Sequence, residues 1–135
     1  MGGTTQTPTG PASFELRLPC EVNSVPQGRA RVRDWCQELG LCDDTIADIQ
    51  LAFTEAAANA VRHSGCDEFD VRALASDGFL VVCVWDQGDG LLDRDPGAGL
   101  GIRIIRALAE SVDFEATQPG TRVTMRFPFT RPSRA

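Results

Sequence analysis

Residues 55–63 read EAAANAVRH, a stretch that combines a polar stripe with several alanines. Glu55 and Asn59 are four residues apart, so on a helix both side chains project from one face, and Arg62 continues that stripe one turn later. Taken alone, the stripe also fits the solvent-facing side of an amphipathic helix. The alanines favour a binding surface, because their small side chains leave room for a ligand to approach the helix.

Outward from this stretch, the pattern predicts a helix that begins after the Asp43-Asp44 pair and ends near His63, before Ser64-Gly65. Acidic side chains suit the positive end of a helix dipole. Its expected core face consists of Ile46, Ile49, Phe53, Ala56, Ala57 and Ala60. An earlier helix is expected over residues 24–39, where apolar residues recur at helical spacing until Gly40.

Extended segments are expected at residues 13–18, 68–75 and 79–85. The last two are joined by a Ser-Asp-Gly sequence whose Asp-Gly step is a strong hairpin signal. Residues 81–85 read VVCVW and are nearly all apolar, which predicts a central strand buried on both faces.

The C-terminal part begins with a loop over residues 86–99, which are rich in glycine and aspartate. A third helix is expected over 100–109, with Ile104, Ile105 and Leu108 inward, and two closing strands over 112–117 and 121–129. This order predicts an α/β fold of the two-layer α+β sandwich type, with three helices on one face of a mixed, mainly antiparallel sheet.

The bulk properties limit the function. A chain of 135 residues fits one domain, expected over 13–129 between flexible tails at 1–12 and 130–135. The net charge of -6 argues against a nucleic-acid surface. All basic residues other than His63 are arginine, which excludes a P-loop lysine. The five cysteines lack a CxxC pair and are expected to be reduced thiols. Neither a signal pattern nor a membrane span is recognisable, so we expect a cytoplasmic protein.

Two glycine motifs follow the polar helix. Asp86 begins a DxGxG motif at the end of the central strand, where a carboxylate can accept a hydrogen bond from a ligand amine. Residues 97–101 read GAGLG and open the third helix, whose free N–H groups attract phosphate. A dinucleotide-binding fold does not account for this motif, because Ile102 occupies the place of the third glycine and a loop precedes it in place of a strand.

Together these segments resemble the N, G1, G2 and G3 boxes of the GHKL (Bergerat-fold) ATPases, in the same order. The matching residues are Glu55-x-x-x-Asn59-Ala60, Asp86-x-Gly88-x-Gly90, Gly97-x-Gly99-Leu100-Gly101-Ile102 and Gly120-Thr121. Within that superfamily the chain is most similar to the anti-sigma-factor serine-protein kinases, given its short length and the Glu-Ala-x-x-Asn-Ala-x-x-His pattern. Sensor histidine kinases are less similar, because they need a phosphoacceptor histidine on a separate helix.

The resemblance implies an ATP site with Mg²⁺. Asn59 would coordinate the ion, Glu55 would act as general base, and Asp86 would bind the adenine amino group with support from Thr121. The glycines at 88, 90, 97, 99 and 101, with Leu100, would let the backbone approach the nucleotide. Arg62 and Arg94 would be phosphate contacts or ordinary surface arginines, and His63 would be structural.

The resemblance further implies a kinase that phosphorylates a serine or threonine on an anti-sigma-factor antagonist and sequesters a sigma factor. It allows a homodimer, which no face in the sequence pattern identifies. The lid between Gly90 and Gly97 is shorter than in better-known kinases of the family. Two alternatives therefore stay open: a nucleotide-binding module that controls a partner without phosphoryl transfer, and an ATPase that only hydrolyses ATP.

Overall fold

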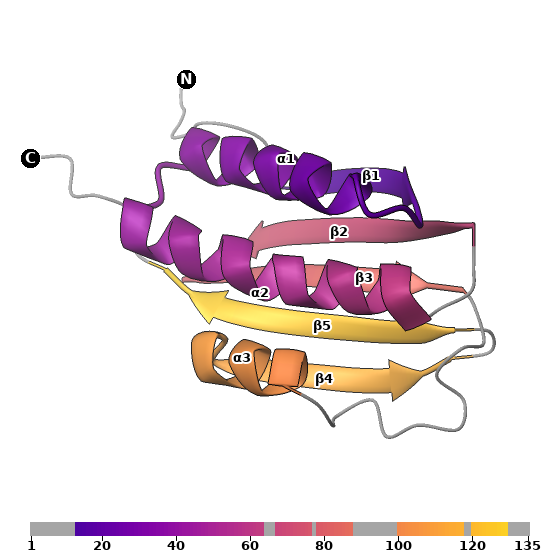
Figure 1. Ribbon diagram of the computed structural model, residues 1–135. Helices are drawn as coiled ribbons and strands as arrows, with labels where there is room; N and C mark the ends of the chain where they lie inside the picture. Colours follow the sequence, from indigo (N-terminus) through magenta and orange to yellow (C-terminus); the bar gives the residue numbers. More distant parts are fainter. Residues whose placement is uncertain (1–12, 64–66, 77, 88–99, 118–119, 130–135) are drawn as a thin grey trace, which may run out of the picture.

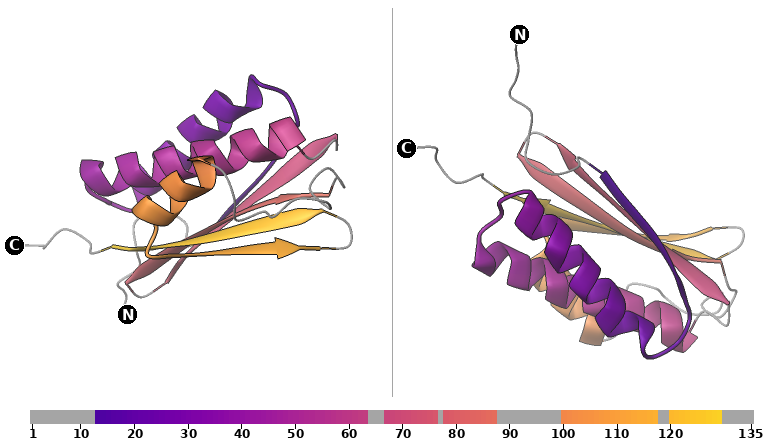
Figure 2. Two further views of the ribbon diagram at one scale, coloured as in Figure 1. Left: turned by 60° about the horizontal axis from the view of Figure 1, so that its bottom comes forward. Right: turned by 90° about the horizontal axis from the view of Figure 1, so that it is seen from above.

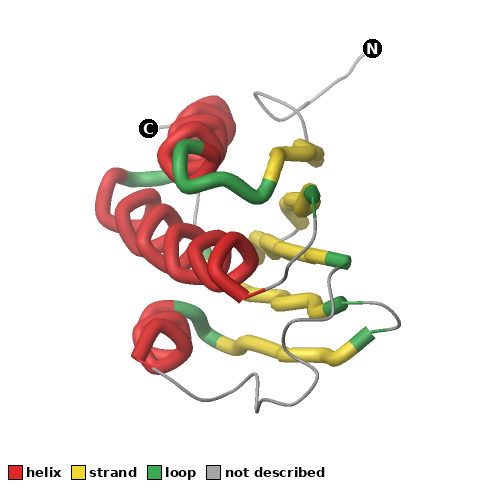
Figure 3. Tube along the Cα trace, turned by 45° about the vertical axis from the view of Figure 1, so that its right-hand side comes forward, coloured by secondary structure: helices red, strands yellow, loops and turns green. Residues whose placement is uncertain are grey.

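The computed structural model describes residues 13–63, 67–76, 78–87, 100–117 and 120–129 as a two-layer structure (Figures 1 and 3). The expected tails at 1–12 and 130–135 lie outside the described residues. The elements are β1 (Ser13–Pro19), α1 (Ser24–Glu38), α2 (Asp43–His63), β2 (Glu68–Ser76), β3 (Phe79–Asp86), α3 (Leu100–Leu108), β4 (Ser111–Ala116) and β5 (Thr121–Pro128). Each lies within one or two residues of the segment expected from the sequence. No helix among them is long and apolar enough to cross a membrane.

The sheet has the strand order β1-β2-β3-β5-β4, and every neighbouring pair is antiparallel. The two-layer α+β sandwich is therefore confirmed, with a sheet that is antiparallel throughout instead of mixed. The physical reason lies in the connection through α3. This helix returns the chain so that β3 and β4 run in the same direction, but β5 lies between them and no parallel pair forms.

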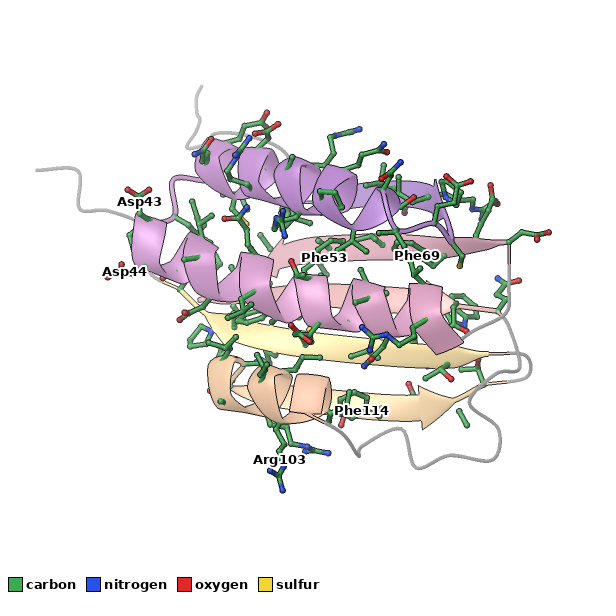
Figure 4. All side chains as sticks on the ribbon, viewed as in Figure 1. Asp43, Asp44, Phe53, Phe69, Arg103 and Phe114 are labelled. Carbon is green, nitrogen blue, oxygen red and sulfur yellow. The ribbon has the colours of Figure 1, made fainter. Side chains whose placement is uncertain are left out.

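The core lies between the helices and one face of the sheet, with α2 across the middle of the sheet (Figure 4). All six residues expected on the core face of α2 are buried. Phe53 from α2 and Phe69 from β2 are among the largest fully buried side chains. At Gly28 of α1, a Cβ atom would lie 2.6 Å from Cζ of Phe53, so the lack of a side chain there allows α1 to pack closely on α2.

The buried stripe of α3 differs from the expected one. Ile102 and Ile105 are buried, together with Ala109 just beyond the helix, whereas Ile104 and Leu108 are half-buried. Of the three residues expected to face inward, only Ile105 lies at the centre of the stripe. A spacing of three and four residues keeps 102, 105 and 109 on one helix face, and positions 104 and 108 flank that face.

Strand β3 was expected to be buried on both faces, and this prediction is wrong for the described part of the chain. All three helices lie on one side of the sheet (Figure 2). Residues 80, 82, 84 and 86 face the helices and are buried, whereas Val81, Cys83 and Trp85 point to the other side and are half-buried. Long arginine side chains supply part of their cover, since the Arg122 guanidinium lies 5.8 Å from the centre of the Trp85 ring.

Candidate functional site

Asn59, Asp86 and Thr121 line one pocket. Asp86 is the last residue of β3 and Thr121 the first of β5, and these two strand ends lie at the same end of the sheet (Figure 1). The hollow contains about 300 Å³ of empty space, its open mouth included. It lies between α2, α3 and the sheet. The residues that line it are Ala56, Asn59, Ala60, Val84, Asp86, Ile102, Phe114, Thr121 and Val123.

The register of the two central strands sets Asp86 beside Thr121. These residues are directly opposite each other in the β3–β5 ladder. Side chains at opposed positions of an antiparallel pair project from the same face and lie about 5 Å apart at Cβ. Both residues are buried, with 5% and 6% of their surfaces exposed. A carboxylate and a hydroxyl therefore form the polar floor of the pocket.

Gly120 holds this floor in place. Its φ of 101° lies in the region that favours glycine. A Cβ atom there would overlap the backbone carbonyl oxygen of Asp86 and would lie 2.7 Å from Cα of Gln87. The chain entering β5 thus packs directly against the end of β3, and a side chain at position 120 would force the two strands apart.

The α2 wall contains two of the alanines that were expected to leave room for a ligand, Ala56 and Ala60. Ala57 is buried like these two residues but does not line the pocket. The amide of Asn59 is half-buried, and within the described part of the chain no hydrogen bond occupies it. Its oxygen and nitrogen are therefore available to a ligand in the pocket.

Glu55 lies one turn before Asn59 and next to the first turn of α3. A Cβ atom at Gly101 would be 2.8 Å from Oε1 of Glu55. The glycine thus leaves the space that this carboxylate occupies. The start of α3 presents backbone N–H groups and the positive end of the helix dipole, which together attract phosphate.

The other residues predicted for the site either lie outside the pocket or are not fully described by the structure. Arg62 is exposed near the end of α2 and does not line the pocket. Leu100 and His63 occupy terminal helical positions whose side chains are not described. Gly88, Gly90, Arg94, Gly97 and Gly99, together with the lid over residues 91–96, lie outside the described residues.

Sequence reasoning missed the apolar walls of the pocket, which are formed by Val84, Ile102, Phe114 and Val123. Phe114 lies on β4 beside the start of α3 (Figure 4). For the two strand residues, Val84 and Val123, the alternation of side chains along a strand could have predicted their place in the pocket. Val84 and Val123 are each two residues from a polar floor residue, and residues two apart on a strand share a face.

This arrangement suits a flat ring with a polar edge. Such a ring would contact apolar side chains on its faces and would meet the carboxylate of Asp86 and the hydroxyl of Thr121 at its edge. Adenine has this shape, and its amino group can donate to a carboxylate. Mg²⁺ is usually held by one or two protein oxygens together with substrate phosphates, and the Asn59 amide oxygen is such a donor. The residues present therefore fit ATP with Mg²⁺.

Comparison with known sequences agrees with this chemistry. A family model described as the histidine kinase-like ATPase domain matches residues 18–127. The chain is 27% identical over 133 residues to a protein named serine-protein kinase RsbW from Bacillus velezensis, and this match covers 83% of the chain and 82% of the relative.

Two solved structures are similar in fold. The chain resembles the RsbU and RsbW domains of Rv1364c from Mycobacterium tuberculosis with a TM-score of 0.75 and 28% identity, over 90% of this chain and 34% of that one. It thus spans about a third of the Mycobacterium chain. The SiaB–SiaC complex from Pseudomonas aeruginosa gives a TM-score of 0.66 at 11% identity, over 84% of this chain and 88% of that one, which shows the shared fold alone.

Proposed function

Since the chain belongs to the family of histidine kinase-like ATPase domains, we propose that it is an ATP- and Mg²⁺-dependent serine/threonine kinase and anti-sigma factor. Its substrate is a small antagonist protein, and its second partner is a sigma factor. The observation that carries the proposal is the meeting of Asn59, Asp86 and Thr121 at one pocket beside the start of α3. The resemblance to RsbW supports the choice of partners.

In this proposal the pocket orients the nucleotide. The carboxylate of Asp86 accepts a hydrogen bond from the adenine amino group, and the hydroxyl of Thr121 supports that edge of the ring. The start of α3 binds the phosphates through backbone N–H groups. Asn59 would hold Mg²⁺ through its amide oxygen, and the ion would supply positive charge to neutralise the phosphates.

Glu55 accepts the proton of the attacking hydroxyl. The serine or threonine oxygen forms a bond to the γ-phosphorus as the bond to the β-phosphate oxygen breaks, and ADP leaves. Glu55 lies one helical turn from Asn59, on the side of α2 that faces Gly101. The proximity of Glu55 to the start of α3 supports its role as the base in this proposal, with the hydroxyl approaching beside the bound phosphates.

Phosphorylation would then change the choice of partner. A phosphoryl group adds a charge of about -1.5 to -2 at neutral pH. On the antagonist, that charge would disrupt the interface with the kinase and free the kinase to hold the sigma factor. We propose that this exchange takes place in the cytoplasm.

The test uses labelled ATP with the antagonist protein that co-purifies with the chain. We expect label on the antagonist with the unmodified protein, loss of Mg-ATP binding in Asn59→Ala, and binding without transfer in Glu55→Gln. Asp48→Asn is the matched control, because Asp48 is an exposed acid on the same helix and does not line the pocket. Unchanged nucleotide binding in Asn59→Ala would refute the site.

A regulatory module that binds ATP without transferring phosphate is the second candidate. The observation that favours it is a sequence spacing, since only six residues separate Gly90 from Gly97, where the family resemblance implies a lid. A short lid would exclude water from the phosphates less completely. Nucleotide binding without label on any protein would support this candidate. Steady phosphate release without an acceptor would instead indicate an ATPase that only hydrolyses ATP.

A further inference from the structure

A connected group of side chains lies on the face of the sheet away from the helices, at the end where the pocket opens on the other face. Trp85 of β3, Arg122 of β5 and Glu115 of β4 are neighbours across the strands, and Thr117 follows the end of β4. We call Trp85, Thr117, Arg122 and Glu115 the clamp. The clamp joins three strands, because β5 lies between β3 and β4 in the sheet (Figure 1).

Hydrogen bonds, an ion pair and a ring contact connect the clamp. The indole Nε1–H of Trp85 donates to Oγ1 of Thr117 over 3.2 Å. The guanidinium carbon of Arg122 lies 5.8 Å from the centre of the Trp85 ring, within the range of a cation–π contact. Nε and Nη2 of Arg122 both donate to Oε1 of Glu115, at 3.0 and 2.6 Å. The indole therefore reaches across β5 to the end of β4, and Arg122 between them is held from both sides.

Each strand residue of the clamp is the neighbour in sequence of a residue that lines the pocket. Because successive side chains of a strand point to opposite faces, the clamp lies directly behind the pocket wall. The same stretches of backbone carry both groups, so a movement of the strands that breaks the clamp also displaces the wall. The neighbours are Trp85 with Asp86, Arg122 with Thr121, and Glu115 with Phe114.

The polar floor of the pocket lies at strand ends, where a sheet is held least firmly. Asp86 ends β3 and Thr121 begins β5. Strand ends open more easily than the centre of a sheet, because fewer hydrogen bonds have to break. Thr117 contacts the backbone just before Thr121, since its N–H donates to the carbonyl oxygen of Gly120 over 2.7 Å. The bond from Trp85 to Thr117 therefore connects the end of β3 with the beginning of β5 through a second route besides the ladder.

We propose that the clamp positions the adenine-binding floor, because the hydrogen bond from Trp85 to Thr117 holds Asp86 and Thr121 at the spacing at which both contact one ring edge. This inference rests on the proposed function, which assigns the floor to adenine. The clamp residues do not line the pocket, so they are positioning residues that act through the floor. Loss of the hydrogen bond should weaken the contact with the adenine edge and leave phosphate binding unchanged.

The test removes this hydrogen bond from each end. Thr117→Val replaces the acceptor hydroxyl by a methyl group, Trp85→Phe keeps an aromatic ring beside Arg122 without the N–H donor, and Thr117→Ser keeps the hydroxyl. Dissociation constants are measured with Mg²⁺ for ATP and for purine riboside triphosphate, which lacks the adenine amino group. The ratio of the two constants reports the contribution of the amino group, because both nucleotides carry the same ribose and phosphates.

The unmodified protein should bind ATP at least about tenfold more tightly than the analogue. In Thr117→Val and in Trp85→Phe we expect ATP binding to weaken about fivefold, which corresponds to the net contribution of a typical hydrogen bond, with the analogue bound as before. The double variant should lose no more than either single variant, because both changes remove the same bond. Thr117→Ser should keep the ratio of the unmodified protein.

Thr124→Val is the matched control. Thr124 is a half-buried threonine on the same face of β5, opposite Cys83 and outside the clamp. The exchange of a hydroxyl for a methyl group is the same as in Thr117→Val, but we expect an unchanged ratio. The urea midpoint of each variant separates an effect on the floor from an effect on stability.

The outcomes distinguish this inference from the proposed function. An unmodified protein that binds neither nucleotide, or that binds both equally, would refute the adenine site itself. Full selectivity in both Thr117→Val and Trp85→Phe, whether or not the urea midpoint falls, would refute the positioning role and leave the adenine site in place. An equal loss of selectivity in Thr124→Val would also refute it, since the effect would then not depend on the clamp.

Discussion

The variant Gly101→Ala is expected to displace the side chain of the proposed base, Glu55, without lowering the stability of the fold. In the interior of a helix, alanine stabilises the folded state over glycine by about 0.5–1 kcal/mol, and in the first turn the difference is smaller. Gly101 is helical, and its φ is not positive, unlike that of Gly40, Gly78 or Gly120. Among the described residues outside α3, the three heavy atoms nearest to the new Cβ would all belong to the Glu55 side chain. We therefore expect an unchanged or slightly raised midpoint of unfolding in urea.

The effect on phosphoryl transfer should be much larger. The new Cβ would lie 2.8 Å from Oε1 of Glu55, about 0.5 Å closer than the ~3.3 Å at which carbon and oxygen atoms normally pack. The carboxylate has to move by about that distance. A misplacement of about 1 Å can cost about a hundredfold in rate, so we expect roughly a tenfold loss here. The assay is the initial rate of label transfer to the antagonist at saturating ATP.

Gly28→Ala is the matched control, because it makes the same change in another helix. There the Cβ would lie 2.6 Å from Cζ of Phe53 and 3.1 Å from Cδ1 of Leu18, both in the core. Overpacking of this kind costs about 1–3 kcal/mol. We expect reduced stability with transfer retained in the folded fraction. A full rate of transfer in Gly101→Ala would refute the role assigned to the position of Glu55.

Two other predictions follow from glycine and cysteine positions. Gly120→Ala should lower the free energy of unfolding by about 2 kcal/mol or more, because a Cβ would overlap the carbonyl oxygen of Asp86 at a φ of 101°; a urea midpoint equal to that of the unmodified protein would contradict this. Among Cys20, Cys36, Cys42 and Cys83, alkylation followed by mass spectrometry should modify Cys42 first, since hydrogen bonds from the Thr45 side chain and backbone lower the pKa of this exposed thiol. Burial raises the pKa of Cys36 to about 12, so its modification should wait for unfolding, and early labelling of Cys36 would contradict the packing of α1.

Most of the fold could be predicted from local patterns. The helix that carries Glu55 and Asn59 has an apolar stripe, an acidic start and a Ser-Gly stop, and these signals act within a few residues of each other. The strands followed from alternation and from turn residues such as Gly78. What local patterns could not give was the order of strands, because the position of β5 between β3 and β4 depends on contacts that are distant in sequence.

The candidate site was predictable in its polar residues and not in its walls. Asn59 and Asp86 belong to motifs of recognisable spacing, whereas Ile102 and Phe114 are ordinary apolar residues whose meeting at the pocket is decided by tertiary packing. The apolar outward side of β3 led to the wrong prediction that this strand is buried on both faces, whereas Val81, Cys83 and Trp85 are half-buried. A local apolar pattern indicates that a side chain is favoured in a buried position. It does not identify the part of the protein that buries it.

The two faces of β3 are linked by strand register. Asp86 opposes Thr121 on the face of the sheet that the helices cover, and the adjacent pair, Trp85 and Arg122, lies on the face away from the helices. Because successive side chains alternate, a slip of one residue between β3 and β5 would move both pairs to the wrong faces at once. Gly120 resists such a slip by packing directly on the end of β3. One backbone contact thus fixes both the floor of the proposed nucleotide pocket and the side chains that β3 and β5 present on the other side of the sheet.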